Sequence, residues 1–547
     1  MRRKLDVPER RKKAGLSELK LISKKVREGC FLANKLRIKS ISDFISESES
    51  GGGRLRKSLG LWDLVSIGVG AVVGTGIFAV VGTAVAGAPG QPGAGTGIVF
   101  SFVIAAVACL FTMLCYAEFA SMIPVSGSAY TYCYASMGEA SAWVMGWVMT
   151  LEYGISAVAV AISWSQYVRQ LLAGFGITMP DWICTNLRDA LSDPALAASL
   201  PRLWGLPVAF NLPAFLAIAL ATVILVLGIR ESSTANNIIV FLKFAVLLFF
   251  IAAGCFYVTP ANWSPFLPNG LHGVLTGTAV IFFAYIGVDA VSTAAEETKN
   301  PERDLPRGMI WTLVVATVLY VLIALVLTGM APAEALGTAD PLARAFALHN
   351  VGWAAGLVSA GAVISMSSVI LITLMGQTRI FYVISRDGLL PGAFSKVHPK
   401  FKTPHVVTIF VGGLAALAAA FANISEVVDL CNIGTLFAFS IVCAGVMILR
   451  RTDPGRERRF RCPGMPFVPI AGILISLTLM VFLPLSTWIL FGVWILLGWI
   501  VYLAYGSIHS RMRKDGLPAG TVLARNVPHI VVSVLFAAAL LWLYFRV

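Results

Sequence analysis

Long apolar stretches separated by short polar segments make up most of this 547-residue chain. A helix needs about 17 to 25 predominantly apolar residues to cross the hydrocarbon core of a bilayer. Thirteen stretches approach or meet this length, at residues 64–87, 96–123, 139–171, 210–229, 236–258, 273–297, 308–331, 352–385, 405–422, 426–449, 467–485, 487–508 and 527–545. The pattern predicts an all-α polytopic membrane protein with about 13 transmembrane helices.

Composition supports this class. The chain is 57% hydrophobic and only 13% charged, with a mean hydropathy of +0.81, which no soluble globular class matches. The nine cysteines are scattered without metal-ligand or disulfide spacing, so we expect no metal and no bound cofactor. All six histidines fall in predicted loops or at span ends, which argues against an intramembrane enzyme.

The net charge of +14 reflects membrane orientation, and we expect no nucleic-acid partner. Residues 1–60 carry 17 Lys and Arg, and placing them in the cytoplasm puts a further 18 in the inner loops against about five outside. This asymmetry predicts a cytoplasmic N-terminus. The chain opens with basic, polar residues instead of an apolar signal segment. Residues 16–45 are compatible either with a basic amphipathic helix on anionic lipid or with a disordered tail.

The first span, residues 64–87, carries six glycines, four of them at Gly68, Gly70, Gly74 and Gly76. Each interior glycine costs a helix about 1 kcal/mol relative to alanine. The cluster predicts an unwound turn near mid-membrane, around Gly74 to Gly76, where bare backbone groups are tolerated only beside protein or a cavity. The alternative is that the glycines only allow close helix packing.

A second interrupted span occurs at residues 275–306, where Gly277, Gly287 and Asp289 disturb an apolar run. It is the sixth span counted from the first. Transporters built from inverted repeats carry broken helices at corresponding positions in their two halves and bind substrate between them. The pairing of spans one and six therefore predicts two repeats of five helices each and favours a binding site over simple packing.

Two charged residues lie deep within predicted spans. Lys243 is far enough from its helix end that a proton-coupling role is favoured over snorkelling to the surface. Glu152 lies mid-span, where it can receive a substrate amine, pair with polar backbone or stay protonated.

Four motifs carry a family resemblance: GVGAVVGTGIF, YAEFASMIPVSGSAYTY, FFAYIGVDAVSTAAEETKNPERDLPRG and GQTRIFYVISRDGLLP. They resemble the amino acid-polyamine-organocation superfamily, and most closely its cationic amino acid transporter branch with its bacterial relatives. Together with the basic, polar start of the chain, this family resemblance favours a bacterial cytoplasmic (inner) membrane. The resemblance implies a LeuT-type fold of 5+5 inverted repeats. We expect a basic N-terminal segment at 1–60, repeats at 61–260 and 261–451, and additional C-terminal helices at 452–547; a thirteenth span departs from the twelve or fourteen usual in the branch.

The resemblance also implies the substrate contacts. Backbone N–H groups at Thr75, Gly76 and Ile77 would hold the substrate carboxylate at the positive end of a half-helix. The substrate ammonium would be held by backbone carbonyls near Ala71 and Val72 in the first break and at Phe282, Ala284 and Tyr285 in the sixth. Phe282 or Phe283 would close over the ligand as an outer gate. Glu152 would line the pocket wall, and Met366 would be a selectivity position. Lys243 matches the proton-coupling lysine of the branch, with a carbonyl near Gly70 and hydroxyls among Ser365, Ser367 and Ser368 as expected partners.

The function that follows is proton-coupled transport of small or medium neutral L-amino acids by alternating access, with the proton as coupling ion. A cationic amino acid or polyamine carrier is the rival within the transporters, and a membrane amino acid sensor is the rival of another class. Expected partners are the amino acid, membrane lipids and an unidentified small membrane subunit.

Overall fold

The computed structural model describes residues 37–44, 59–88, 90–123, 125, 127–192, 194–203, 205–228, 233–513 and 518–544. The helix or tail expected over residues 16–45 lies largely outside these residues. Within them, nine helices are long and apolar enough to cross a membrane, one bent pair adds another, and three shorter helices are apolar. Together they account for the thirteen predicted stretches, and the all-α polytopic class is confirmed.

The helices of the first predicted repeat are α3 (Leu61–Val72) continuing into α4 (Val81–Ala86), α5 (Ile98–Met122), α7 (Glu139–Thr150) continuing into α8 (Ser156–Gly174), α11 (Leu212–Leu227) and α12 (Ser233–Gly254). Those of the second are α13 (Gly270–Ile281) with α14 (Ala290–Thr293), α15 (Pro301–Met330), α17 (Gly352–Arg386), α18 (His405–Phe421) and α19 (Ile424–Thr452). Three further spans follow: α20 (Phe467–Val481), α21 (Leu485–Val501) with α22 (Ser507–His509), and α23 (Ala519–Tyr544).

Short elements connect the spans. These are helices α6 (Ser128–Met137), α9 (Leu187–Ser192), α10 (Pro194–Ser199) and α16 (Pro341–Leu348), and two antiparallel hairpins, β1 (Gly87–Ala88) with β2 (Gln91–Pro92) and β3 (Arg202–Leu203) with β4 (Leu206–Pro207). Tighter 3-10 turns occupy 95–97, 181–183, 255–257, 260–263, 282–285, 295–297, 333–336 and 392–395, and π-helical turns occupy 76–80, 151–155 and 502–506.

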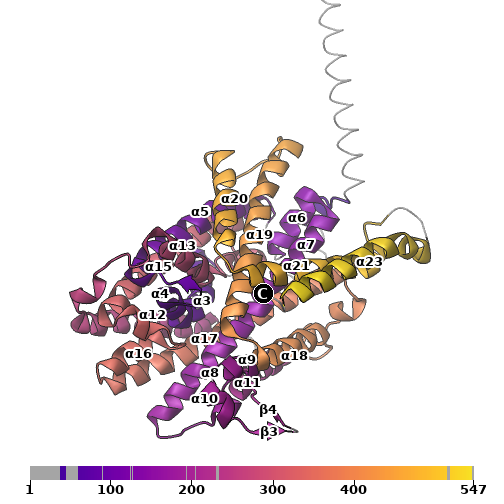
Figure 1. Cartoon of the computed structure of the whole chain (residues 1–547). Coiled ribbons are helices and arrows are strands. Elements are labelled where there is room, and N and C mark those ends of the chain that lie inside the picture. The colour runs from indigo at the N-terminus through magenta and orange to yellow at the C-terminus, as the bar shows by residue number, and fades with distance from the viewer. Residues whose placement is uncertain are drawn as a thin grey trace, which may run out of the picture.

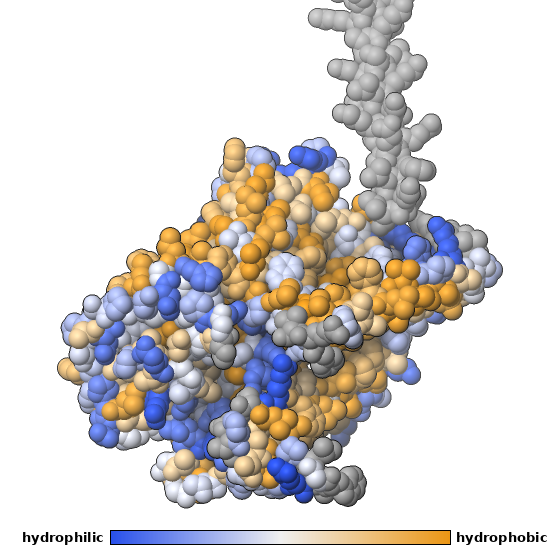
Figure 2. Space-filling model, viewed as in Figure 1, coloured by the Kyte–Doolittle hydropathy of each residue, from blue (hydrophilic) through white to orange (hydrophobic). Residues whose placement is uncertain are grey.

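Helices at corresponding positions of the two predicted repeats pack against one another. The helix α5 packs along α15, α8 along α17, and α11 along α18 (Figure 1). Paired contacts of this kind are what two related five-helix units produce, although the domain boundaries themselves stay predictions. The last span, α23, runs along the outside of the bundle, and its apolar surface is visible in Figure 2.

Residues 37–44, which we call the N-terminal anchor, dock where α7, α17 and α22 begin or end. Lys39 Nζ lies 2.9 Å from Asp387 Oδ1, and Arg37 lies 2.8 Å from Glu139 Oε1. Phe44 is buried and packs edge-on against Tyr134 of α6. The chain is therefore fixed to the bundle before the first span begins.

Candidate substrate site

The first span breaks where its glycines are densest. The helix α3 ends at Val72, Val73 is extended, and the outer half resumes through the π-helical turn 76–80 at an angle of 44°. Gly76 faces the second broken span: a Cβ at this position would lie 2.3 Å from Ala284 Cα. Only glycine allows the two breaks to approach this closely.

The sixth span breaks on both sides of Ala284, the residue at this crossing. The helix α13 gives way to the 3-10 turn 282–285, Ile286 is extended, and Gly287 has φ +101° before α14 begins at Ala290. This positive φ favours glycine. Both breaks predicted from the glycine pattern are thus present and face one another.

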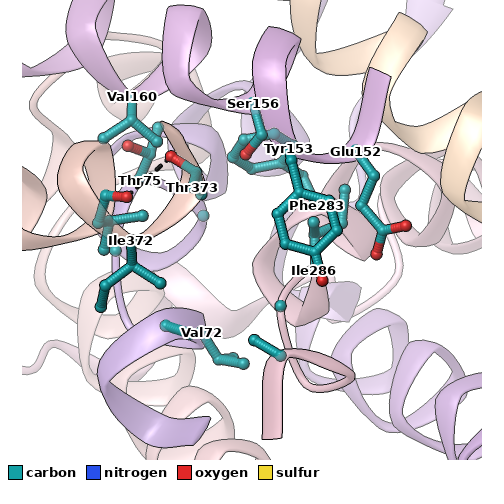
Figure 3. Close-up of a pocket in the computed structure, with 16 residues that line it drawn as sticks. Val72, Thr75, Glu152, Tyr153, Ser156, Val160, Phe283, Ile286, Ile372 and Thr373 are labelled. Atoms are coloured by element: carbon teal, nitrogen blue, oxygen red, sulfur yellow. Dashed lines mark hydrogen bonds between the residues drawn. The ribbon is translucent and has the colours of Figure 1, made fainter. Parts of the chain in front are cut away.

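A narrow cavity lies between the two breaks and the helices α7–α8 and α17 (Figure 3). Its lining residues are Ala71, Val72, Gly74, Thr75, Gly76, Glu152, Tyr153, Ser156, Val160, Phe283, Ile286, Gly287, Ala290, Val369, Ile372 and Thr373. Its volume is about 20 Å³. The cavity is therefore too small to hold an amino acid, and its walls must separate to receive one.

Two polar side chains that line this cavity are buried with no hydrogen-bond partner among the described residues. They are the Thr75 hydroxyl and both carboxyl oxygens of Glu152, on residues that are 2% and 1% exposed. Figure 3 shows them at opposite sides of the cavity. Because buried polar groups are almost always paired, the Thr75 hydroxyl indicates a polar ligand in the cavity, and the Glu152 carboxyl group indicates either such a ligand or a shared proton.

A second carboxyl group lies beside Glu152. Asp289 is fully buried, its Oδ2 accepts a hydrogen bond from Tyr153 Oη at 2.8 Å, and it interacts electrostatically with Glu152. The π-helical turn 151–155 presents Glu152 and Tyr153 on consecutive positions toward these groups. Two ionised carboxylates so close repel one another, so a cation or a proton stabilises the pair.

The N–H groups at the first break differ in their availability. Those of Ile77 and Phe78 donate to Gly74 O at 3.2 Å, whereas the described residues provide no backbone acceptor for Thr75 and Gly76. Among the carbonyls, Val72 O accepts from Tyr320 Oη at 3.0 Å. The Thr75 and Gly76 N–H groups are thus the ones left for an anion.

Lys243 lies outside this cavity, behind the first span. It is 1% exposed, and its Nζ donates to Gly70 O at 2.6 Å, two residues before α3 ends. Ser365 donates to Val73 O at 3.2 Å, while the Ser367 and Ser368 hydroxyls donate to carbonyls within α17. Lysine and serine thereby hold the carbonyls of Gly70 and Val73, on the two sides of the last residue of α3.

The cavity brings together six of the predicted binding residues: Ala71, Val72, Thr75, Gly76, Glu152 and Phe283. Five others are buried beside it without lining it, namely Ile77, Phe282, Ala284, Tyr285 and Met366. Their proposed roles stay predictions.

Several lining residues were missed from the sequence, although helical spacing carries a signal for them. Ser156 and Val160 follow Glu152 at intervals of four and therefore share its helix face. On α17 the lining residues are Val369, Ile372 and Thr373, one turn or more beyond Met366. Placing them requires the rotation of α17 about its axis, which the sequence does not specify.

A family profile described as "Amino acid permease" matches residues 59–502, which include both breaks and the cavity. The chain belongs to the amino acid permease family. It is a multi-pass membrane transporter and not an enzyme, and the expected membership of the amino acid-polyamine-organocation superfamily is confirmed.

The chain resembles the branched-chain amino acid permease BcaP of Bacillus subtilis, with 45% identity over 479 residues, covering 87% of this chain and 99% of that protein. It is 44% identical to the methylthioribose transporter of the same organism over 430 residues, covering 78% and 90%. Human cationic amino acid transporter 4 is 35% identical over 371 residues, covering 66% of this chain and 56% of that protein.

Proposed function

We propose that this amino acid permease carries small or medium neutral L-amino acids together with a proton, by alternating access, across a bacterial cytoplasmic membrane. The observation that supports the proposal most is the narrow cavity between two facing helix breaks, with the buried Thr75 hydroxyl, unpartnered among the described residues, on one side and the Glu152 carboxyl group on the other. A zwitterion supplies both an anion and a cation to such a site.

In the proposed complex the substrate carboxylate binds the N–H groups of Thr75 and Gly76 and the Thr75 hydroxyl. This end of the outer half-helix carries the positive pole of the helix dipole. The ammonium takes carbonyl oxygens of the two breaks, and Glu152 supplies a nearby acceptor.

The wall of the cavity favours an uncharged side chain. Val160, Val369 and Ile372 form an apolar surface beside Thr75. An aliphatic side chain gains about 25 cal/mol for each Å² of apolar surface that it buries there. The similarity to a branched-chain amino acid permease supports this substrate class.

The rival proposal is a cationic amino acid or polyamine carrier, for which Glu152 and Asp289 offer a second ammonium site. These cases are separated by the thermal unfolding temperature of the purified protein. It is measured at two pH values with each of the twenty amino acids, with common polyamines and with methylthioribose. We expect the largest stabilisation from leucine-sized neutral ligands. Stabilisation by arginine or putrescine alone would overturn the neutral-substrate proposal.

A sensor of amino acids is separated from a carrier by counterflow. Liposomes containing the protein and preloaded with unlabelled ligand take up labelled ligand if the protein is a carrier. Binding without counterflow identifies a sensor.

A further inference from the structure

An apolar groove of about 610 Å³ runs between α11 and α18 on the outer surface of the bundle. Two adjacent glycines shape it. Gly412 lets the helices touch, because a Cβ at this position would lie 2.0 Å from Thr222 Oγ1. Gly413 lies beside open space, because a Cβ there would have no atom within 4 Å. Thr222 is the one polar side chain among the described residues that line the groove, and its hydroxyl donates to Ile218 O at 2.7 Å. The groove therefore offers water few partners, and an apolar occupant suits it.

The walls of the groove face the bilayer. Val223, Leu227, Ile409, Leu414 and Leu417 are all more than 40% exposed, as residues of a lipid-facing surface are. Apolar residues also dominate the surface over α18 in Figure 2. A gap left empty there forfeits dispersion contacts, so an acyl chain of a lipid fills it favourably.

A basic loop stands at one mouth of the groove. Thr403 Oγ1 donates to Val226 O at 2.7 Å, which fixes the loop over the end of α11. Lys400 and Lys402 in this loop are exposed. They lie at the same end of the bundle as the N-terminal anchor. The loop follows the end of α17, and Asp387 at that end pairs with Lys39 of the anchor.

The loop is preorganised. The Nδ1 atom of His398 accepts from the N–H groups of Lys400 and Phe401, both at 3.2 Å, and His398 N donates to Thr403 O at 2.8 Å. Lys402 has φ +58°, a left-handed conformation that a non-glycine residue adopts at an energetic cost. The turn that carries the two lysines is therefore held in shape by its own hydrogen bonds.

The lengths of the helices place this loop at the edge of the hydrocarbon core, next to the lipid headgroups. The helix α11 has 16 residues and α18 has 17, which correspond to about 24 to 26 Å at about 1.5 Å per residue. The hydrocarbon core is about 30 Å thick, so the ends of this pair lie within it or at its edge unless the bilayer thins. Basic side chains there reach the phosphate layer.

We propose that the α11–α18 groove is a binding site for an anionic phospholipid, with one acyl chain between the helices and the phosphate at Lys400 and Lys402. This site is separate from the substrate cavity and does not rest on the proposed function. It combines an apolar slot, two cations at its mouth and a depth that matches the headgroup, which together select an acidic lipid over a zwitterionic one.

The test is native mass spectrometry of the full-length protein, delipidated in detergent and then titrated with phosphatidylglycerol or phosphatidylcholine. We expect tighter retention of phosphatidylglycerol. The double variant Lys400→Gln/Lys402→Gln should weaken it about tenfold or more and leave phosphatidylcholine unchanged. Gly413→Trp, which fills the groove from a position with open space, should remove the most tightly held lipid of either kind.

Matched controls are Lys299→Gln, an exposed lysine on another loop, and Gly356→Trp, a glycine on α17 whose Cβ would also meet open space. Neither should change retention. The proposal would be overturned if the parent retained the two lipids equally, or if Gly413→Trp retained as much phosphatidylglycerol as the parent. It would also be overturned if the parent gave the mass of a dimer and Gly413→Trp did not, because a second copy of the chain would then occupy the groove. Competition by free inorganic phosphate without an acyl chain would also overturn it.

Discussion

At the scale of single residues, the site depends on a contact between two backbones. Gly76 and Ala284 bring the two broken spans together, and no other residue type fits at position 76. The orphan hydroxyl of Thr75 is next to this contact. The residues that create the site and those that bind within it are thus neighbours along the chain.

We expect Gly76→Ala to abolish most transport. Its methyl group must displace backbone at Ala284, and overpacking of this kind costs about 1–3 kcal/mol, equivalent to about tenfold to a hundredfold in rate. Uptake into proteoliposomes measures the loss. Gly356→Ala, which adds a methyl group in open space, should transport like the parent, and a Gly76→Ala variant with parental uptake would show that the breaks need not touch.

The buried ion pair of the N-terminal anchor gives a prediction about stability. Lys39→Ala leaves the buried Asp387 carboxylate with Tyr130 as its side-chain partner among the described residues, and removal of one member of a buried pair costs about 3–5 kcal/mol. The thermal unfolding temperature should fall clearly for Lys39→Ala and less than additively for Lys39→Ala/Asp387→Ala. The control is Arg459→Ala, because the ion pair of Arg459 with Glu302 is exposed and should contribute little to stability. If Lys39→Ala and Arg459→Ala lowered the unfolding temperature equally, a structural role for the anchor would be contradicted.

At the scale of elements, the two broken spans differ in how they are interrupted. The first bends at an extended residue and a π-helical turn, whereas the sixth unwinds between Ile281 and Ala290, a stretch that includes a glycine with φ +101°. The sixth span therefore depends on one backbone conformation that other residues resist.

Gly287→Ala tests that dependence. An alanine at φ +101° costs about 1–3 kcal/mol and favours rewinding of the sixth span. We expect substrate-induced thermal stabilisation to be reduced or lost, while Gly392→Ala, at a loop position with open space and no positive φ, retains it. Full ligand stabilisation of Gly287→Ala would show that the break does not form part of the site.

Much of this architecture was predictable because its signals are local in sequence. Span lengths follow from hydropathy, and the breaks follow from glycines that lie within a few residues of them. Met366 shows where local signals end: the cavity is instead lined by Val369, Ile372 and Thr373, which depends on the rotation of α17 against α8. The partners of Lys39 and Arg37 could not be predicted from local sequence either, since they lie 348 and 102 residues away along the chain.

At the scale of the whole molecule, Lys243 and the substrate cavity meet the first span at neighbouring residues. Lys243 holds Gly70 O, and the cavity begins at Ala71. A proton that leaves Lys243 weakens its hold on the inner half of the first span. Substrate binding and protonation therefore act on the same few peptide groups, which is the basis proposed here for their coupling.

The most direct test of this coupling is uptake of labelled leucine into proteoliposomes with and without an inward proton gradient. The account predicts that the gradient accelerates uptake by the parent and by Lys299→Ala, and that Lys243→Ala loses this acceleration while it still catalyses leucine counterflow. If Lys243→Ala responds to the gradient as the parent does, Lys243 is not the coupling residue and the central claim is wrong.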